Sequence, residues 1–200
     1  NPGDIHYADI DASYDIDSLN LLSASFGGYF YTLNVQGDGY NQLLNPAGQQ
    51  LYSYRNSYWM PGYNHHSWNG PFDYQHKTHL QGDRLTLSYM LALTRQHTDH
   101  ENTHTELYNV PFAYTGSLMN QRERFTEHTL QVDWRRPLGR GHQLEVGAKY
   151  INRDNNSHNT QTFYGIDADT SDEFQHTTRV LAGYADYIFR TTKFSARAGL

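Results

Sequence analysis

The stretch Leu85-Thr-Leu-Ser-Tyr-Met-Leu-Ala-Leu93 decides the fold. Its odd-numbered positions hold leucine or tyrosine throughout, whereas its even-numbered positions hold Thr86, Ser88, Met90 and Ala92. Successive side chains of a β-strand point to opposite faces of the sheet. The pattern therefore predicts a strand that covers one apolar face and leaves the other face polar.

Four further segments repeat this two-residue period, namely residues 8–16, 22–30, 129–135 and 144–150. Residues 72–77 and 194–200 show shorter versions of the same pattern. Residues 178–189 also read as a strand, but either of their faces could be the apolar one. No window holds the apolar spacing of an amphipathic helix. The sequence thus predicts an all-β, antiparallel chain of about eight strands.

The expected connections alternate in length along the chain. Residues 17–20, 78–83, 136–142 and 190–193 are short, and residues 34–70, 96–124 and 152–174 are long. Outer-membrane barrels have tight turns on the periplasmic side and longer loops outside. The alternation favours an up-and-down transmembrane β-barrel.

The composition of the 200 residues agrees with such a barrel. There are 17 tyrosines, 9 phenylalanines and 3 tryptophans, yet the mean hydropathy is −0.81. A barrel can be polar on average because only alternate strand residues meet lipid. A formal charge of −6 argues against nucleic-acid binding, and the absence of cysteine excludes disulfides and thiolate metal sites. No apolar run reaches the ~20 residues of a membrane helix.

Three segments resemble consecutive strands of a known family. Residues 144–155, 180–187 and 194–200 are similar to barrel strands of TonB-dependent outer-membrane receptors, specifically the Bacteroidetes-type outer-membrane β-barrel family. The resemblance implies a 22-stranded barrel with an amino-terminal plug. Because the chain stops at Leu200 inside an expected strand, residues 1–200 are expected to be a partial barrel domain without the plug and the carboxy-terminal strands.

The same resemblance implies a function and a location. The family imports a scarce ligand, such as a siderophore, a cofactor, a glycan or a peptide, across the outer membrane of Gram-negative, Bacteroidetes-like cells. The implied partners are outer-membrane lipid, the remaining barrel strands and plug, TonB acting through the plug, and the ligand, which is a small molecule or an oligomer. Two alternatives remain open. One is a self-contained eight-stranded outer-membrane barrel, and the other is a soluble β-sandwich that binds carbohydrate.

Aromatic residues accumulate in the expected loop 34–70, which would face outward. Amphipathic rings in exposed loops suit contact with sugars, peptides or planar ligands, although they can also pack a loop on itself. We therefore expect ligand contact from Tyr58, Trp59, Tyr63 and Trp68, with the two tryptophans as the strongest candidates. Neither tryptophan is expected in a lipid-facing strand.

Other polar clusters favour structural roles. His97, His100 and His104 with Glu106 hold metal-ligand types, but in a long loop without a helix we expect a solvated segment rather than a metal site. The inward charges Asp133, Arg135, Glu145 and Lys149 are expected to be hydrated or paired in a barrel interior. No catalytic residue, bound metal or cofactor is predicted, and we do not expect an enzyme.

Overall fold

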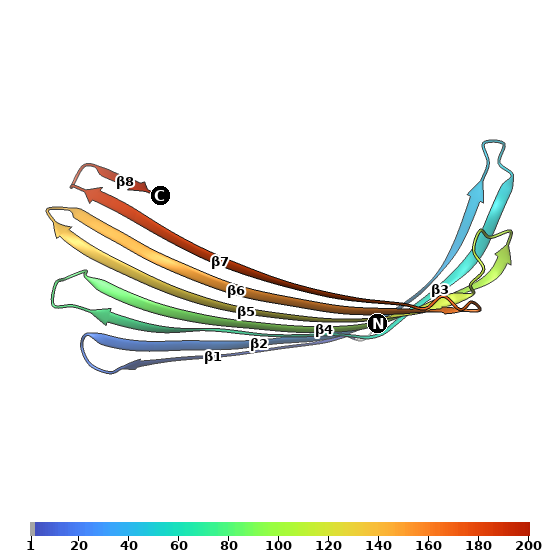
Figure 1. The fold of residues 1–200 in the computed structure, drawn as a ribbon, viewed down its shortest axis with the longest axis horizontal. Helices are drawn as coiled ribbons and strands as arrows, with labels where there is room; N and C mark the ends of the chain where they lie inside the picture. The colour runs from blue at the N-terminus through green and yellow to red at the C-terminus, as the bar shows by residue number, and fades with distance from the viewer. Residues whose placement is uncertain (1–2) are drawn as a thin grey trace.

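A single antiparallel sheet makes up the computed structural model, which describes residues 3–200. Its strands are β1 (Gly3–Asp15), β2 (Asn20–Leu44), β3 (Gln50–Lys77), β4 (Arg84–Tyr108), β5 (Gly116–Gly139), β6 (His142–Tyr164), β7 (Thr170–Arg190) and β8 (Ser195–Gly199). They lie side by side in chain order, as Figure 1 shows. The predicted all-β, up-and-down architecture of eight strands is confirmed.

The strand register gathers the alternating apolar residues on one surface. Leu87 lies opposite Val132, which in turn lies opposite Ala148. The neighbouring rows continue the surface on both sides, because every second residue of a strand has the same orientation. We call this surface the apolar face; it carries Leu85, Leu87, Leu91, Leu130, Val132, Trp134, Leu144 and Val146. The opposite surface is the polar face.

Pairing with β6 decides the orientation of β7, which its own sequence leaves open. Leu181 lies opposite Tyr150 and Ala185 lies opposite Val146. These odd-numbered residues of β7 therefore share the apolar face. Tyr184 lies opposite Gly147, so the even-numbered residues belong to the polar face.

The four predicted short connections are confirmed, and local chemistry explains two of them. Between β1 and β2, the Asp17 Oδ1 atom accepts hydrogen bonds from the backbone N–H groups of Leu19 at 2.8 Å and Asn20 at 2.9 Å. Between β5 and β6, Arg140 and Gly141 both have positive φ, 52° and 84°. A two-residue hairpin turn of this kind matches the twist of the flanking strands. A Cβ atom at Gly141 would also collide with the Arg190 carbonyl oxygen.

The predicted long loops are wrong, because most of their residues continue the strands. The connections that remain are residues 45–49, 109–115 and 165–169. Backbone ladders extend nearly to these tips, for example where Asp38 pairs with Ser57 and where Thr103 pairs with Gly116. Such hairpins have polar residues on both faces, so they lack the apolar alternation that reveals a strand in a sequence. Figure 1 shows these extensions at the end of the sheet opposite the short turns.

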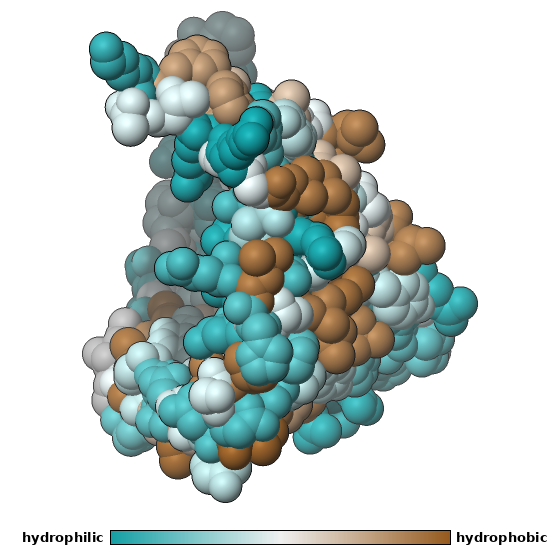
Figure 2. All heavy atoms as spheres, turned by 90° about the vertical axis from the view of Figure 1, so that its left-hand side faces the viewer, coloured by the Kyte–Doolittle hydropathy of each residue, from teal (hydrophilic) through white to brown (hydrophobic). Residues whose placement is uncertain are grey.

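The sheet has no second layer to cover its apolar face. Among residues 3–200, Ile188 is the one apolar side chain that is buried, whereas Leu130 is 52% and Leu181 79% exposed. Viewed from the short-turn end, apolar side chains gather on one side of the molecule (Figure 2). A β-sandwich needs two packed sheets, so the soluble-sandwich alternative does not describe this chain. The described strands β1 and β8 pair only with β2 and β7, respectively. No helix within residues 3–200 is long and apolar enough to cross a membrane.

Candidate functional site: the two faces of the sheet

Ion pairs connect β5, β6, β7 and β8 on the polar face next to the short turns. Arg135 lies 2.6 Å from the Glu145 carboxylate, and Arg197 lies 3.6 Å from the same group. Arg197 also pairs with Asp186 at 2.6 Å. Arg135, Glu145 and Asp186 are direct partners in one row of β5, β6 and β7. Arg197 of β8 lies two residues from Gly199, the direct partner of Asp186. Their opposite charges compensate each other across four strands.

Two further carboxylates of the polar face also have partners. Asp133 accepts hydrogen bonds from the Gln131 amide at 2.8 Å and from the Tyr184 hydroxyl. Glu127, farther along β5, accepts from Arg153 Nε at 2.7 Å. Arg135, Glu145 and Glu127 thus have partners of opposite charge. Asp133 accepts from neutral groups, and Lys149 forms no ion pair within residues 3–200.

Aromatic side chains replace the ion pairs in the half of the polar face away from the short turns. The Tyr31 ring lies 5.1 Å from the Tyr63 ring and 6.2 Å from the His65 ring. The Tyr58 ring contacts His100 edge-on at 4.6 Å. Nearer the tips, further rings pack in the same way, namely Tyr54, His104, Phe112, Tyr114 and Phe163. We call these residues, with Tyr31, Tyr58, Tyr63, His65 and His100, the aromatic surface.

A bulge in β3 brings Tyr58 and Tyr63 to the same face. Residues five positions apart in a regular strand point to opposite faces. The pairing of β3 with β4 shifts between Trp59 and Asn64, and Gly62 takes a positive φ of 71° within this shift. The Asn34 side chain holds the bulge by accepting a hydrogen bond from the Gly62 N–H at 2.6 Å.

The four predicted ligand-contact residues do not form one cluster. Tyr58 and Tyr63 belong to the polar face, whereas Trp59 and Trp68 lie on the opposite face. Trp68 stacks on Phe26 with a ring-centroid distance of 5.4 Å and meets Phe30 edge-on at 4.5 Å. The expectation that Trp68 lies in a loop outside the apolar strands is therefore wrong. It lies in β3, directly opposite Leu93.

Sequence reasoning missed most members of the aromatic surface. Tyr31 and His65 are direct partners in β2 and β3. The two-residue period of residues 22–30 would have assigned Tyr31 to the polar face if the strand had been extended by one residue. His100 and His104 are also on the polar face, since residues four apart in a strand share a face. The interpretation of residues 97–104 as a loop is wrong, because they belong to β4.

Local environment shifts the pKa values of three residues outside the apolar band, namely His104, Tyr63 and Tyr164. Burial lowers the pKa of His104 below its usual value, because the charged form loses solvation. Burial is the main cause that raises the pKa of Tyr63, and electrostatic repulsion from the nearby Tyr31 is the second cause. The hydrogen bond that the Tyr164 hydroxyl donates to Glu101, 2.8 Å long, raises the pKa of Tyr164. At neutral pH, Tyr63 and Tyr164 are therefore uncharged.

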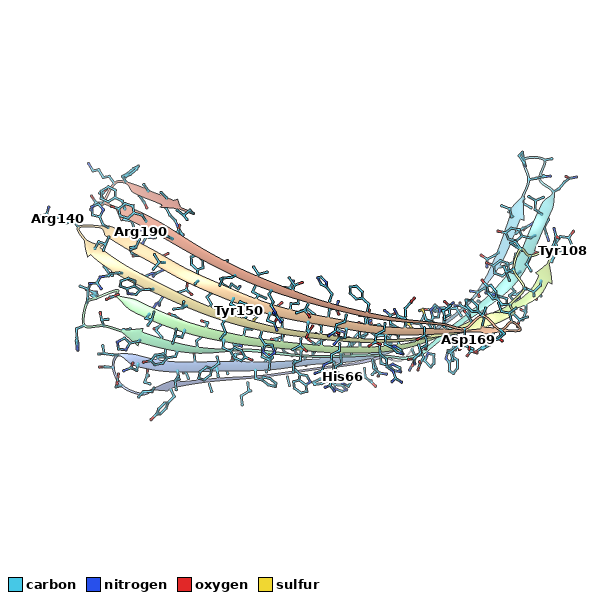
Figure 3. The ribbon with its side chains drawn as sticks, viewed as in Figure 1. His66, Tyr108, Arg140, Tyr150, Asp169 and Arg190 are labelled. Atoms are coloured by element: carbon cyan, nitrogen blue, oxygen red, sulfur yellow. The ribbon has the colours of Figure 1, made fainter. Side chains whose placement is uncertain are left out.

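The apolar face has the dimensions of a lipid-facing band. On β4 it runs from Leu85 to Leu93, a span of about 26 Å at the usual rise per strand residue. Aromatic rings flank it at both ends: Trp134, Tyr187 and Phe189 near the short turns, and Phe26, Phe30 and Trp68 at the far end. An outward apolar band of about 25 Å between two aromatic girdles is typical of outer-membrane barrels. Figure 3 shows Tyr150 within this length of the sheet, with Arg140 at the short-turn end and Tyr108 at the opposite tip.

These features define a transmembrane β-barrel sheet, with one face for lipid and one for the barrel interior. Comparison with known families agrees: residues 76–200, more than half of the chain, match the outer membrane protein beta-barrel family. The chain belongs to that family and is an outer-membrane protein. A search of curated proteins finds no match. The apolar face is accordingly the lipid-facing surface, and the polar face is the interior surface.

Proposed function

We propose that this chain is part of the barrel of a Bacteroidetes-type TonB-dependent receptor that imports a scarce ligand. The strand resemblance of residues 144–155, 180–187 and 194–200 supports this class. The aromatic surface is the single observation that carries the ligand-binding part of the proposal. Its strand residues belong to the interior face, in the half of the sheet that extends away from the short turns, and Phe112 and Tyr114 of the connection 109–115 pack against them. Because such turns face the periplasm in outer-membrane barrels, these rings line the route of a ligand that arrives from outside.

The ligand contacts in this proposal are Tyr31, Tyr58, Tyr63 and His100. Each combines a flat apolar surface with a polar atom, which suits siderophores, cofactors, glycans or peptides. Trp59 and Trp68 lie on the other face of the same strand and serve as matched comparisons. The interior tyrosines, rather than the two tryptophans, are therefore the ligand contacts in this proposal.

The proposal assigns transport rather than catalysis. Two carboxylates near the short turns are engaged with arginines, namely Glu145 with Arg135 and Asp186 with Arg197. Each of these carboxylates neutralises an arginine, which is a structural role in a barrel interior. We propose that this charged region contacts the plug, through which TonB delivers energy.

Uptake by cells tests the proposal. The intact receptor would be expressed in its native host, and depletion of ferric siderophores, cobalamin, oligosaccharides and peptides from the medium would be followed with and without TonB. We expect uptake of one of these solutes to need both the receptor gene and TonB, and to fall about tenfold or more in Tyr31→Ala/Tyr63→Ala. Trp59→Ala should retain uptake. The proposal fails if no solute depends on both genes.

A self-contained eight-stranded barrel is the second candidate, since eight strands suffice for a small closed barrel. It would bring β1 and β8 together, so cross-linking between these two strands distinguishes it from a segment of a larger barrel.

A further inference from the structure

Three arginines lie on the lipid-facing surface just beyond the apolar band. Arg95 follows Leu93 by two residues in β4, so both side chains share that surface. Arg124 of β5 is the direct partner of Arg95, and Arg122 is the direct partner of His97. The basic patch, as we call Arg95, Arg122 and Arg124, therefore starts where the apolar band ends.

The arginines of the patch are exposed, and the nearby Asp99 of the same surface pairs with His97 instead of with them. Within residues 3–200 none of the three arginines forms an ion pair. Like charges directly opposite each other in a sheet are destabilising. Arg95 and Arg124 nevertheless face each other, and within residues 3–200 neither has a carboxylate partner like the one that Glu145 provides for Arg135 on the interior face.

A hollow in the surface lies among these arginines. It has a volume of about 480 Å³. Its other lining residues include His66, His97, His158 and Asn156, and its one outward carboxylate, Glu173, comes from the more distant strand β7. The Glu123 side chain, also on the lining, alternates to the interior face, where it accepts a hydrogen bond from Gln121 at 2.6 Å. The hollow thus offers hydrogen-bond donors and net positive charge.

The position of the patch identifies its ligand. The short turns face the periplasm, so the far end of the apolar band meets the outer leaflet. The lipid of that leaflet is a glycolipid whose headgroup carries phosphates above its acyl chains. Guanidinium groups bind phosphate through paired hydrogen bonds, and the apolar band below the patch matches acyl chains.

We propose that the basic patch binds the headgroup phosphates of lipopolysaccharide in the outer leaflet. The bound anion neutralises the facing Arg95 and Arg124, while the lipid chains cover the adjacent apolar face. This inference rests on membership of the outer-membrane barrel family and on the strand register. It is independent of the import function.

Binding of purified lipid tests the proposal. The intact protein in neutral detergent would be titrated with lipopolysaccharide and with enzymatically dephosphorylated lipopolysaccharide, and bound lipid would be counted by native mass spectrometry. We expect wild type to prefer the phosphorylated lipid by about tenfold or more, and Arg95→Gln/Arg124→Gln to lose that preference. Arg84→Gln/Lys149→Gln removes two charges from the interior face of β4 and β6 and should bind like wild type.

The remaining outcomes also decide the matter. Arg95→Lys/Arg124→Lys keeps the charge but loses paired hydrogen bonding, so its affinity for the phosphorylated lipid should lie between those of wild type and the Gln variant. Resistance of each variant to unfolding on a gel shows that its barrel is intact. Equal binding by the Gln variant and wild type overturns the proposal, as does equal binding of dephosphorylated lipid. Displacement of the lipid by millimolar inorganic phosphate would instead reveal a site for free anions.

Discussion

Thr86 and Leu87 are neighbours in β4 whose side chains lie on opposite faces of the sheet. Leu87, on the lipid-facing surface, is opposite Val132, whereas Thr86 is opposite Asp133 on the interior face. Leu87 is 46% exposed, so lipid is its main environment in the membrane. The same chemical change should therefore have different effects at the two positions.

Leu87→Arg should destabilise the folded barrel by about 2–4 kcal/mol, because it moves a charge to the middle of the hydrocarbon region. Thr86→Arg adds the same charge beside the interior carboxylates and should cost much less. Folding titrations of the intact protein in lipid vesicles measure both values. Equal losses at the two positions would contradict the assignment of lipid-facing and interior surfaces.

At the scale of elements, we call the strand ends around residues 45–49, 109–115 and 165–169 the outer hairpins. They depend on packing among aromatic rings rather than on an apolar band. His104 of β4 lies 5.2 Å from both Tyr54 and Phe112 and 5.5 Å from Tyr114. Burial there lowers the pKa of His104 from the usual 6.5. Protonation therefore opposes the packed form of the hairpin tip.

The sign of the pH effect follows from this shift. In the opened tip His104 takes up a proton as the pH falls through its ordinary pKa of 6.5, whereas in the packed tip it takes up that proton only at lower pH. The packed form therefore loses stability as the pH falls below 6.5. This loss is complete once the pH is below the pKa of His104 in the packed form. We expect proteolysis within residues 109–115 to accelerate between pH 7.5 and about 5. His104→Phe keeps a flat ring without the titration and should remove most of this dependence.

The matched control for that experiment is His79→Phe, which changes a histidine in the turn at the other end of the sheet. This variant should be cleaved at the same rate as wild type at each pH. The comparison at each pH also corrects for the change in activity of the protease itself. An unchanged pH profile in His104→Phe would assign the effect to another group.

For the whole molecule, the question is which strands lie next to β1 and β8. Both have one hydrogen-bonded neighbour among the described strands. An unpaired strand edge readily joins another strand. In a 22-stranded barrel these neighbours are further strands of the receptor, whereas in an eight-stranded barrel β1 and β8 pair with each other.

Engineered disulfides distinguish these arrangements, because residues 1–200 contain no cysteine. Ala12→Cys/Ala24→Cys joins direct partners of β1 and β2 and should cross-link within one molecule. Pairs between Ala8 or Ala12 of β1 and Ala196 or Ala198 of β8 should not cross-link in the intact receptor. Mobility on non-reducing gels gives the result. Efficient β1–β8 cross-linking would favour the eight-stranded barrel over the larger one.

Sequence alone determined the elements in which one face is apolar. The alternation of residues 85–93 and 144–150 predicted strands and their lipid-facing side chains, because lipid on one face and a polar interior on the other impose opposite demands on neighbouring residues. The short turns were equally readable, since they separate such strands by only a few polar residues. Together these features favoured an outer-membrane barrel but left the soluble β-sandwich open, because a shared core would also bury one face of each strand.

Tertiary structure decided the orientation of β7, the extent of the outer hairpins and the faces of the four aromatic candidates. In β7, apolar residues occur at both parities, so only pairing with β6 separates Leu181 from Tyr184. In the outer hairpins both faces are polar, and strand formation rests on backbone pairing that leaves no periodic signal. The bulge at Gly62 then reverses the parity of β3, which brings Tyr58 and Tyr63 to one face and leaves Trp59 on the other. A one-residue change of register exchanges the two faces of a strand, and that register is a property of neighbouring strands rather than of the segment itself.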